Sequence, residues 1–121
     1  MKRILIVEDE AGLRGLMCQA LERCGYGVQG AGDGRAALAL FQQQPADLVI
    51  TDILMPEVEG LETIVSLRKQ RPNLKIIAIS GGGYYAGHDY LPVAQALGAA
   101  RTLSKPFTCE ELEAAVRSLL D

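Results

Sequence analysis

Histidine, cysteine and long apolar runs are all scarce in this chain of 121 residues, and each shortage excludes a class of protein. His88 is the single histidine, so it has no companion for a histidine-based metal site or catalytic pair. The three cysteines, at positions 18, 24 and 109, are odd in number and unrelated in spacing. This pattern favours buried thiols in a reducing compartment over a disulfide framework.

The sequence also lacks the features of exported and nucleic-acid-binding proteins. No apolar run is long enough to span a membrane, and no cationic, apolar leader precedes the first strand pattern, so we expect a cytoplasmic protein without membrane contact. The net charge of −3 and the pI near 5.1 give no reason to expect direct nucleic acid binding. Repeats, linkers and low-complexity tracts are absent, and we predict one domain over residues 1–121.

Short apolar strand patterns alternate with helical patterns along the chain. The first strand ends abruptly at an acidic run, and the central one ends at Asp52, four residues before Pro56. Thr108 and Glu111 form a capping box for the last helix. The predicted strands span residues 4–7, 26–31, 47–51, 75–79 and 101–103. A helical pattern follows each strand. The residues that recur at helical spacing are Leu13, Leu16, Met17, Ala20, Leu21 and Cys24 in the first helix, Ala37, Leu40 and Phe41 in the second, Leu61, Ile64, Val65 and Arg68 in the third, and Leu112, Ala115, Val116 and Leu119 in the last, with a further helix over 90–97.

This alternation predicts an α/β fold with a five-stranded parallel sheet covered by helices on both faces. In such sheets the ligand site lies beyond the carboxyl ends of the strands. The first strand ends at Glu8 and Asp9, the third at Asp52, the fourth at Ser80 and the fifth at Lys105. We therefore expect these five residues to meet at one edge of the sheet.

The chemistry of these residues fits phosphoryl transfer. Clustered carboxylates repel one another unless a cation neutralises them, and such hard oxygen ligands suit Mg²⁺. The cation, the Lys105 ammonium and the Ser80 hydroxyl could then surround a phosphoryl group, with Asp52 as the nucleophile that forms an aspartyl phosphate. Each residue also has a purely structural alternative. These alternatives are Asp9 as a helix N-cap, Glu8 or Glu10 as a solvated loop charge, Asp52 and Ser80 as turn formers, and Lys105 as a surface cation.

Four motifs together resemble the response-regulator receiver domain of two-component signalling, over essentially the whole chain. They are Ile4-Leu-Ile-Val-Glu-Asp-Glu10, Thr51-Asp-Ile-Leu-Met-Pro56 with Gly60, Ser80-Gly81, and Lys105-Pro-Phe107. The resemblance implies the flavodoxin-like strand order 2-1-3-4-5. It also implies that Asp52 is phosphorylated by a histidine kinase or a histidine phosphotransfer protein.

The same resemblance implies a role for each site residue. Asp9, Asp52 and the backbone carbonyl of Leu54 would ligate Mg²⁺, with Glu8 helping through water. Lys105 would pair with the phosphoryl oxygens and precede a cis proline, while Ser80 would move to bond the phosphate. Such a protein is a phosphoacceptor and not an enzyme, apart from self-phosphorylation with small phosphodonors and self-dephosphorylation. We expect a monomer or a weak phosphorylation-dependent dimer that signals to a downstream protein.

Two features depart from the usual receiver. Thr102 stands three positions before the active-site lysine, where the family often has an aromatic switch residue. This change affects the expected output surface of helix four, strand five and helix five. The connection after Ser80 contains the glycine-rich segment Gly81 to Gly87 and is longer than usual.

Two other functions compete with the phosphorylation switch. A phosphohydrolase of the haloacid-dehalogenase kind also uses an aspartate nucleophile after an apolar strand. It needs a second acid two positions later, where this chain has Leu54. A pseudo-receiver would use the same fold as a protein-interaction module without phosphorylation. The acidic residues, Ser80 and Lys105 disfavour this alternative, whereas Thr102 is compatible with it.

Overall fold

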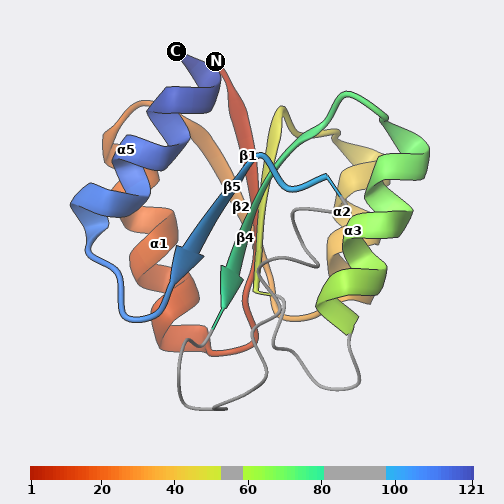
Figure 1. Ribbon diagram of the computed structural model, residues 1–121, viewed down its shortest axis with the longest axis horizontal. Helices are drawn as coiled ribbons and strands as arrows, with labels where there is room; N and C mark the ends of the chain where they lie inside the picture. Colours follow the sequence, from red (N-terminus) through yellow and green to blue (C-terminus); the bar gives the residue numbers. More distant parts are fainter. Residues whose placement is uncertain (53–58, 81–97) are drawn as a thin grey trace.

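The computed structural model describes residues 1–52, 59–80 and 98–121 and has helices on both faces of a central parallel sheet (Figure 1). The strand order is β2-β1-β3-β4-β5, and every neighbouring pair is parallel, which confirms the predicted fold. The strands are β1 (Arg3–Val7), β2 (Gly27–Ala31), β3 (Leu48–Asp52), β4 (Lys75–Ser80) and β5 (Arg101–Ser104). The helices are α1 (Ala11–Arg23), α2 (Gly34–Gln43), α3 (Glu59–Gln70) and α5 (Cys109–Leu120). The predicted helix over 90–97 lies outside the described residues.

Alternation along the strands divides the core into two clusters, one on each face of the sheet. In β1, Ile4 and Ile6 face the α1–α5 side, whereas Leu5 and Val7 face the α2–α3 side. Figure 1 shows α1 and α5 together on one side of the sheet and α2 and α3 on the other. Central strands buried on both faces need apolar residues at every position, which explains why their sequences show continuous apolar runs.

Local signals in the sequence fix most helix ends. Asp33 caps α2 by accepting from the Ala36 N–H at 2.7 Å. The capping box of α5 is present, with both the Thr108 and Glu111 contacts at 3.0 Å. Gly25 follows α1 with a φ of +95°, a conformation that glycine adopts without steric cost.

The predicted helical stripes of α1 and α3 are each partly wrong, and in α1 the exception is Leu16, which is 59% exposed. Ile64 is fully buried as expected, but Val65 is 38% exposed, and Leu67 is buried in its place. Successive helical residues are about 100° apart around the axis, so Val65 and Leu67 fall on opposite sides of Ile64. The face that packs on the sheet includes Leu67, and the apolar side chain of Val65 therefore lies toward solvent.

The cysteine prediction is also partly wrong. All three thiols are free, but none is fully buried: Cys18 and Cys24 are half-buried, and Cys109 is exposed at the first position of α5. An apolar helical pattern predicts which side chains point toward the core, but it does not predict how deeply each one is buried. In the described ranges, no helix combines the length and apolarity needed to cross a membrane.

Candidate functional site

Glu8 and Asp52 lie together at the carboxyl edge because of the register between β1 and β3. Ile6 pairs with Ile50 and Val7 with Thr51, so the next residue on each strand is one of the two acids. Both acids are almost completely buried, with relative exposures of 0% for Glu8 and 3% for Asp52. Two adjacent strands thus place two carboxylates side by side at the end of a fully apolar core.

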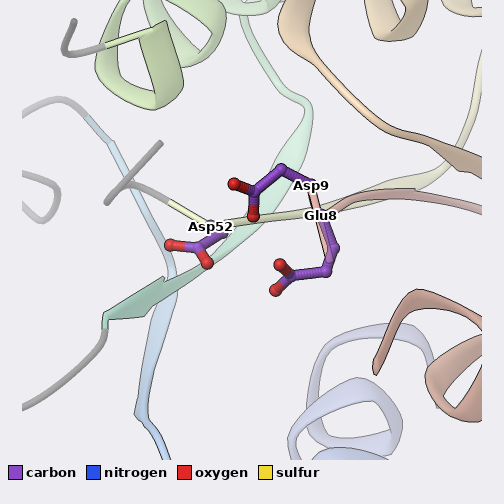
Figure 2. A group of neighbouring side chains, drawn as sticks. All are labelled: Glu8, Asp9 and Asp52. Carbon is purple, nitrogen blue, oxygen red and sulfur yellow. The ribbon is translucent and has the colours of Figure 1, made fainter. Parts of the chain in front are cut away.

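Asp9 completes an acidic cluster with Glu8 and Asp52, although it lies at the exposed surface. Figure 2 shows the three carboxyl groups directed toward a common space, two from the end of β1 and one from β3. One oxygen from each residue lies within 4.8 Å of the others, so the three could ligate one metal ion. The mixture of buried and exposed acids leaves the cluster open on the Asp9 side.

Lys105 supplies the positive charge of the site. Its backbone N–H donates to the Ser80 carbonyl at 2.8 Å, which continues the β4–β5 ladder by one residue. Its ammonium donates to Asp52 Oδ2 at 2.6 Å and lies 2.9 Å from Glu8 Oε1. The Lys105–Pro106 peptide bond is cis, as the resemblance implied.

The electrostatics of the site show an excess of negative charge. Burial raises the pKa of the Glu8 carboxyl group from 4.5 to about 7, against the lowering effect of the Glu10 N–H that it accepts. Burial alone lowers the pKa of Lys105, but its close contacts with the carboxylates of Asp52 and Glu8 outweigh this effect, so the pKa is raised. One ammonium therefore faces two buried carboxylates.

Glu8 Oε1 indicates how the remaining charge could be balanced. The Lys105 ammonium forms an ion pair with this oxygen at 2.9 Å, but it is also bonded to Asp52. Within the described ranges this shared ammonium is the group that balances the buried oxygen, so the site has room for a further positive charge. A hard divalent cation fits both the oxygen donors and the excess negative charge.

Ser80 lies at the same edge as the acidic cluster. It is the last residue of β4, is 2% exposed, and follows Ile79, the register partner of Asp52. Thr102, in the edge strand β5, pairs with Ala78 of β4 and is half-buried. The predicted ligand Leu54 and the glycine-rich segment Gly81 to Gly87 lie outside the described residues.

Several structural alternatives from the sequence are wrong. Glu10, and not Asp9, is the N-cap of α1, and its carboxylate accepts from two backbone N–H groups at 2.9 and 2.8 Å. Glu8 is buried and not solvated, and Asp52 is the buried last residue of β3. Lys105 is paired with both acids and is only 27% exposed at its side chain.

Sequence reasoning missed Arg14, which donates from Nη1 to the backbone carbonyl of Glu8 at 2.7 Å. In the sequence Arg14 is an ordinary polar residue of an amphipathic helix. Its side chain passes close to two glycines at the end of β2, Gly30 and Gly32, and glycines in this segment predicted only an edge strand. No sequence signal connects the two segments.

A family model described as response regulator receiver domain matches residues 4–117 of the chain. The response regulator receiver protein CpdR of Brucella abortus is 37% identical, over 99% of this chain and 98% of that protein. The transcriptional regulatory protein PhoP of Bacillus subtilis is 32% identical, over 98% of this chain and 48% of its own length. The chain thus spans nearly all of one relative and about half of the other.

Solved structures show the same similarity in three dimensions. The chemotaxis response regulator CheY4 of Vibrio cholerae has a TM-score of 0.86 and 30% identity, with 99% of both chains covered. The response regulator TrrA of Thermotoga maritima, in complex with Mg²⁺-BeF, has a TM-score of 0.84 and 37% identity. That match covers 99% of this chain and 100% of TrrA.

Proposed function

The chain belongs to the response regulator receiver domains of two-component systems, and we propose that it works as a phosphorylation switch with Asp52 as the phosphoacceptor. Members of this family are phosphoacceptors and not enzymes in the usual sense. The observation that carries the proposal is the position of Asp52, which is buried, lies beside Glu8 and Asp9, and contacts the Lys105 ammonium. A buried carboxylate with this surrounding has the groups that acyl phosphate formation requires.

In the proposed reaction, a carboxylate oxygen of Asp52 forms a bond to the phosphorus of a phosphohistidine. The phosphorus–nitrogen bond breaks, and its electron pair leaves with the imidazole of the kinase or phosphotransfer protein. Lys105, 2.6 Å from Asp52 Oδ2, then neutralises the phosphoryl oxygens. The hydroxyl of Ser80, at the end of the adjacent strand, donates to one of those oxygens.

Mg²⁺ is the metal that we propose for the site. Asp9 and Asp52 would ligate it directly and Glu8 would help through water, and the carbonyl of Leu54 is the further direct ligand expected from the family resemblance. The bound ion supplies positive charge against the developing charge of the phosphoryl group. The relative TrrA, 37% identical, was crystallised in complex with Mg²⁺-BeF, which supports this choice of metal.

The proposed output is a change in the surface formed by helix four, β5 and α5, read by a downstream protein. Position 102 in β5 is a threonine, so the readout cannot use rotation of an aromatic side chain there. We propose residues 1–121 as one receiver domain, monomeric or weakly dimeric after phosphorylation, without direct contact with nucleic acid or membrane. Its donor is a histidine kinase or a phosphotransfer protein in the cytoplasm.

The experiment that tests this function is incubation with Mg²⁺ and acetyl phosphate, followed by intact mass measurement. Wild type is expected to gain the mass of one phosphoryl group, and EDTA is expected to prevent the gain. The matched control is Asp47→Asn, which removes an acid at the opposite edge of the sheet and leaves the gain unchanged. Absence of a gain in wild type, or an undiminished gain in Asp52→Asn, contradicts the switch and leaves an interaction module without phosphorylation.

A further inference from the structure

Arg14 reaches from α1 to the turn that carries two of the three acids. Its Nη1 donates to the Glu8 carbonyl at 2.7 Å, while the Glu8 N–H donates to the Ala31 carbonyl at 3.0 Å. The backbone of Glu8 is therefore held on both sides, by β2 through its N–H and by α1 through its carbonyl. The contact is partly buried, so solvent competes with it less than at the open surface.

Two glycines near the end of β2 make room for the Arg14 side chain. A Cβ on Gly30 would lie 3.1 Å from both Cγ and Cδ of Arg14, and a Cβ on Gly32 would lie 3.3 Å from its Nη1. Neither glycine has the positive φ that would require glycine for conformational reasons. Their absent side chains instead allow the arginine to pass close to the strand.

The peptide unit between Glu8 and Asp9 is planar, so the direction of its carbonyl also fixes the direction of the Asp9 N–H and Cα. Glu10 holds the following residues, because its N–H donates to Glu8 Oε2 at 3.0 Å and its side chain caps α1. Arg14 is thus the contact that orients the plane shared by two acids of the cluster.

We propose that Arg14 is a positioning residue of the metal site, which orients the Glu8–Asp9 peptide so that both carboxylates face Asp52. This inference rests on the proposed function, because it assumes that the acidic cluster binds Mg²⁺. Contacts that orient metal ligands affect affinity by about tenfold or more when they are removed. The planar guanidinium matters as well as its charge, since an ammonium cannot reproduce its fixed donor directions.

The test is a calorimetric Mg²⁺ titration of the full chain in four forms: wild type, Arg14→Met, Arg14→Lys and Arg23→Met. Arg23 is an exposed arginine in the last turn of the same helix, so its variant matches the change in charge and helix content. We expect Arg14→Met to weaken Mg²⁺ binding about tenfold, Arg14→Lys to weaken it less, and Arg23→Met to change it less than twofold. The phosphorylation rate of Arg14→Met with acetyl phosphate should recover at saturating Mg²⁺.

Two further measurements separate positioning from a general loss of structure. In the metal-free protein, amide hydrogen exchange at Asp9 and Glu10 should accelerate in Arg14→Met more than exchange in the β1 core. Gly30→Ala retains the arginine but pushes its stem away, and should weaken Mg²⁺ binding in the same direction, which keeps the inference testable if Arg14→Met does not fold.

Three results would overturn the inference. The first is wild-type Mg²⁺ affinity in both Arg14→Met and Gly30→Ala. The second is an equal loss in Arg23→Met, which would indicate overall charge as the cause. The third is failure of wild type to bind Mg²⁺, which would also overturn the proposed function, whereas the first two results leave that function intact.

Discussion

At the amino end of the sheet, Asp47 and Tyr26 each have a hydrogen-bond partner within the chain, whereas at the carboxyl end two buried carboxylates share the ammonium of Lys105. Asp47 at the amino end accepts from the Arg3 N–H at 2.8 Å, and its own N–H donates to the Arg3 carbonyl at 2.9 Å. Tyr26 nearby donates to Asp121 Oδ1 at 3.4 Å.

This difference between the two ends of the sheet indicates that the amino end contributes to stability. Hydrogen bonds of the amino-end kind are satisfied within the chain and each contribute modestly to folding. The carboxyl end keeps Glu8 buried, incompletely bonded and with a raised pKa, an arrangement that costs free energy. Such a cost is expected at a site of the proposed function, which would bind a cation and a phosphoryl group.

The largest stability effect should come from removing the positive charge of Lys105. Lys105→Met leaves the carboxylates of Glu8 and Asp52 without their ammonium, and we expect the free energy of unfolding at pH 8 without Mg²⁺ to fall by about 3 kcal/mol. Urea unfolding measures this change. Lys69→Met, which removes an exposed lysine from the last turn of α3, is the control and should cost less than about 0.5 kcal/mol. Equal losses in the two variants would remove the distinction between the ends of the sheet.

The pH dependence of stability should identify Glu8 as the acid whose burial destabilises the folded chain when it is ionised. Burial raises its pKa in the folded protein to about 7, above the ordinary value of 4.5, so the folded state binds this proton more tightly than the unfolded state does. Its stabilising contribution is full below about pH 4.5 and is lost as the pH rises through 7. We expect a fall on the order of 2 kcal/mol between pH 5 and 8 without Mg²⁺.

Thermal unfolding of wild type and Glu8→Gln over this pH range checks the assignment. The variant lacks the titrating group and should show a flatter profile, and saturating Mg²⁺ should restore the stability of wild type at pH 8. Identical profiles for the two proteins would place the pH dependence elsewhere in the chain.

The smallest predicted change in stability has opposite signs at the two ends of the sheet. Asp52→Asn removes one of two neighbouring negative charges and leaves Lys105 paired with Glu8, so we expect a gain of about 1 kcal/mol without Mg²⁺. Asp47→Asn at the amino end weakens a satisfied contact and should lower stability by about 1 kcal/mol. Chemical denaturation of both variants gives the comparison. A loss in both would mean that the acids at the two edges play the same structural role.

Much of the fold was predictable because its signals are local. The apolar runs of β1, β3 and β4, the Thr108 capping box and the glycine after α1 depend on a few adjacent residues. The convergence of Glu8, Asp9, Asp52 and Lys105 also followed, since parallel strands bring their carboxyl ends to one edge.

What sequence reasoning missed depends on contacts between distant segments. Val65 fits an apolar helical stripe, but only packing on the sheet decides that Leu67 is buried instead. Several acidic residues in a row offer more than one N-cap, and burial of Glu8 together with the cap at Glu10 separates their roles. The contact of Arg14 requires the spatial approach of β2, which no local pattern encodes.

The most direct test of the central claim is to identify the residue that carries the phosphoryl group. Chain phosphorylated with acetyl phosphate and Mg²⁺ is reduced with borohydride, which converts an aspartyl phosphate into homoserine, and is then mapped by peptide mass spectrometry. We predict homoserine at position 52 and unmodified aspartate at positions 9 and 47. Homoserine at another position, or a phosphoryl group that resists reduction because it is on a hydroxyl, would contradict the account.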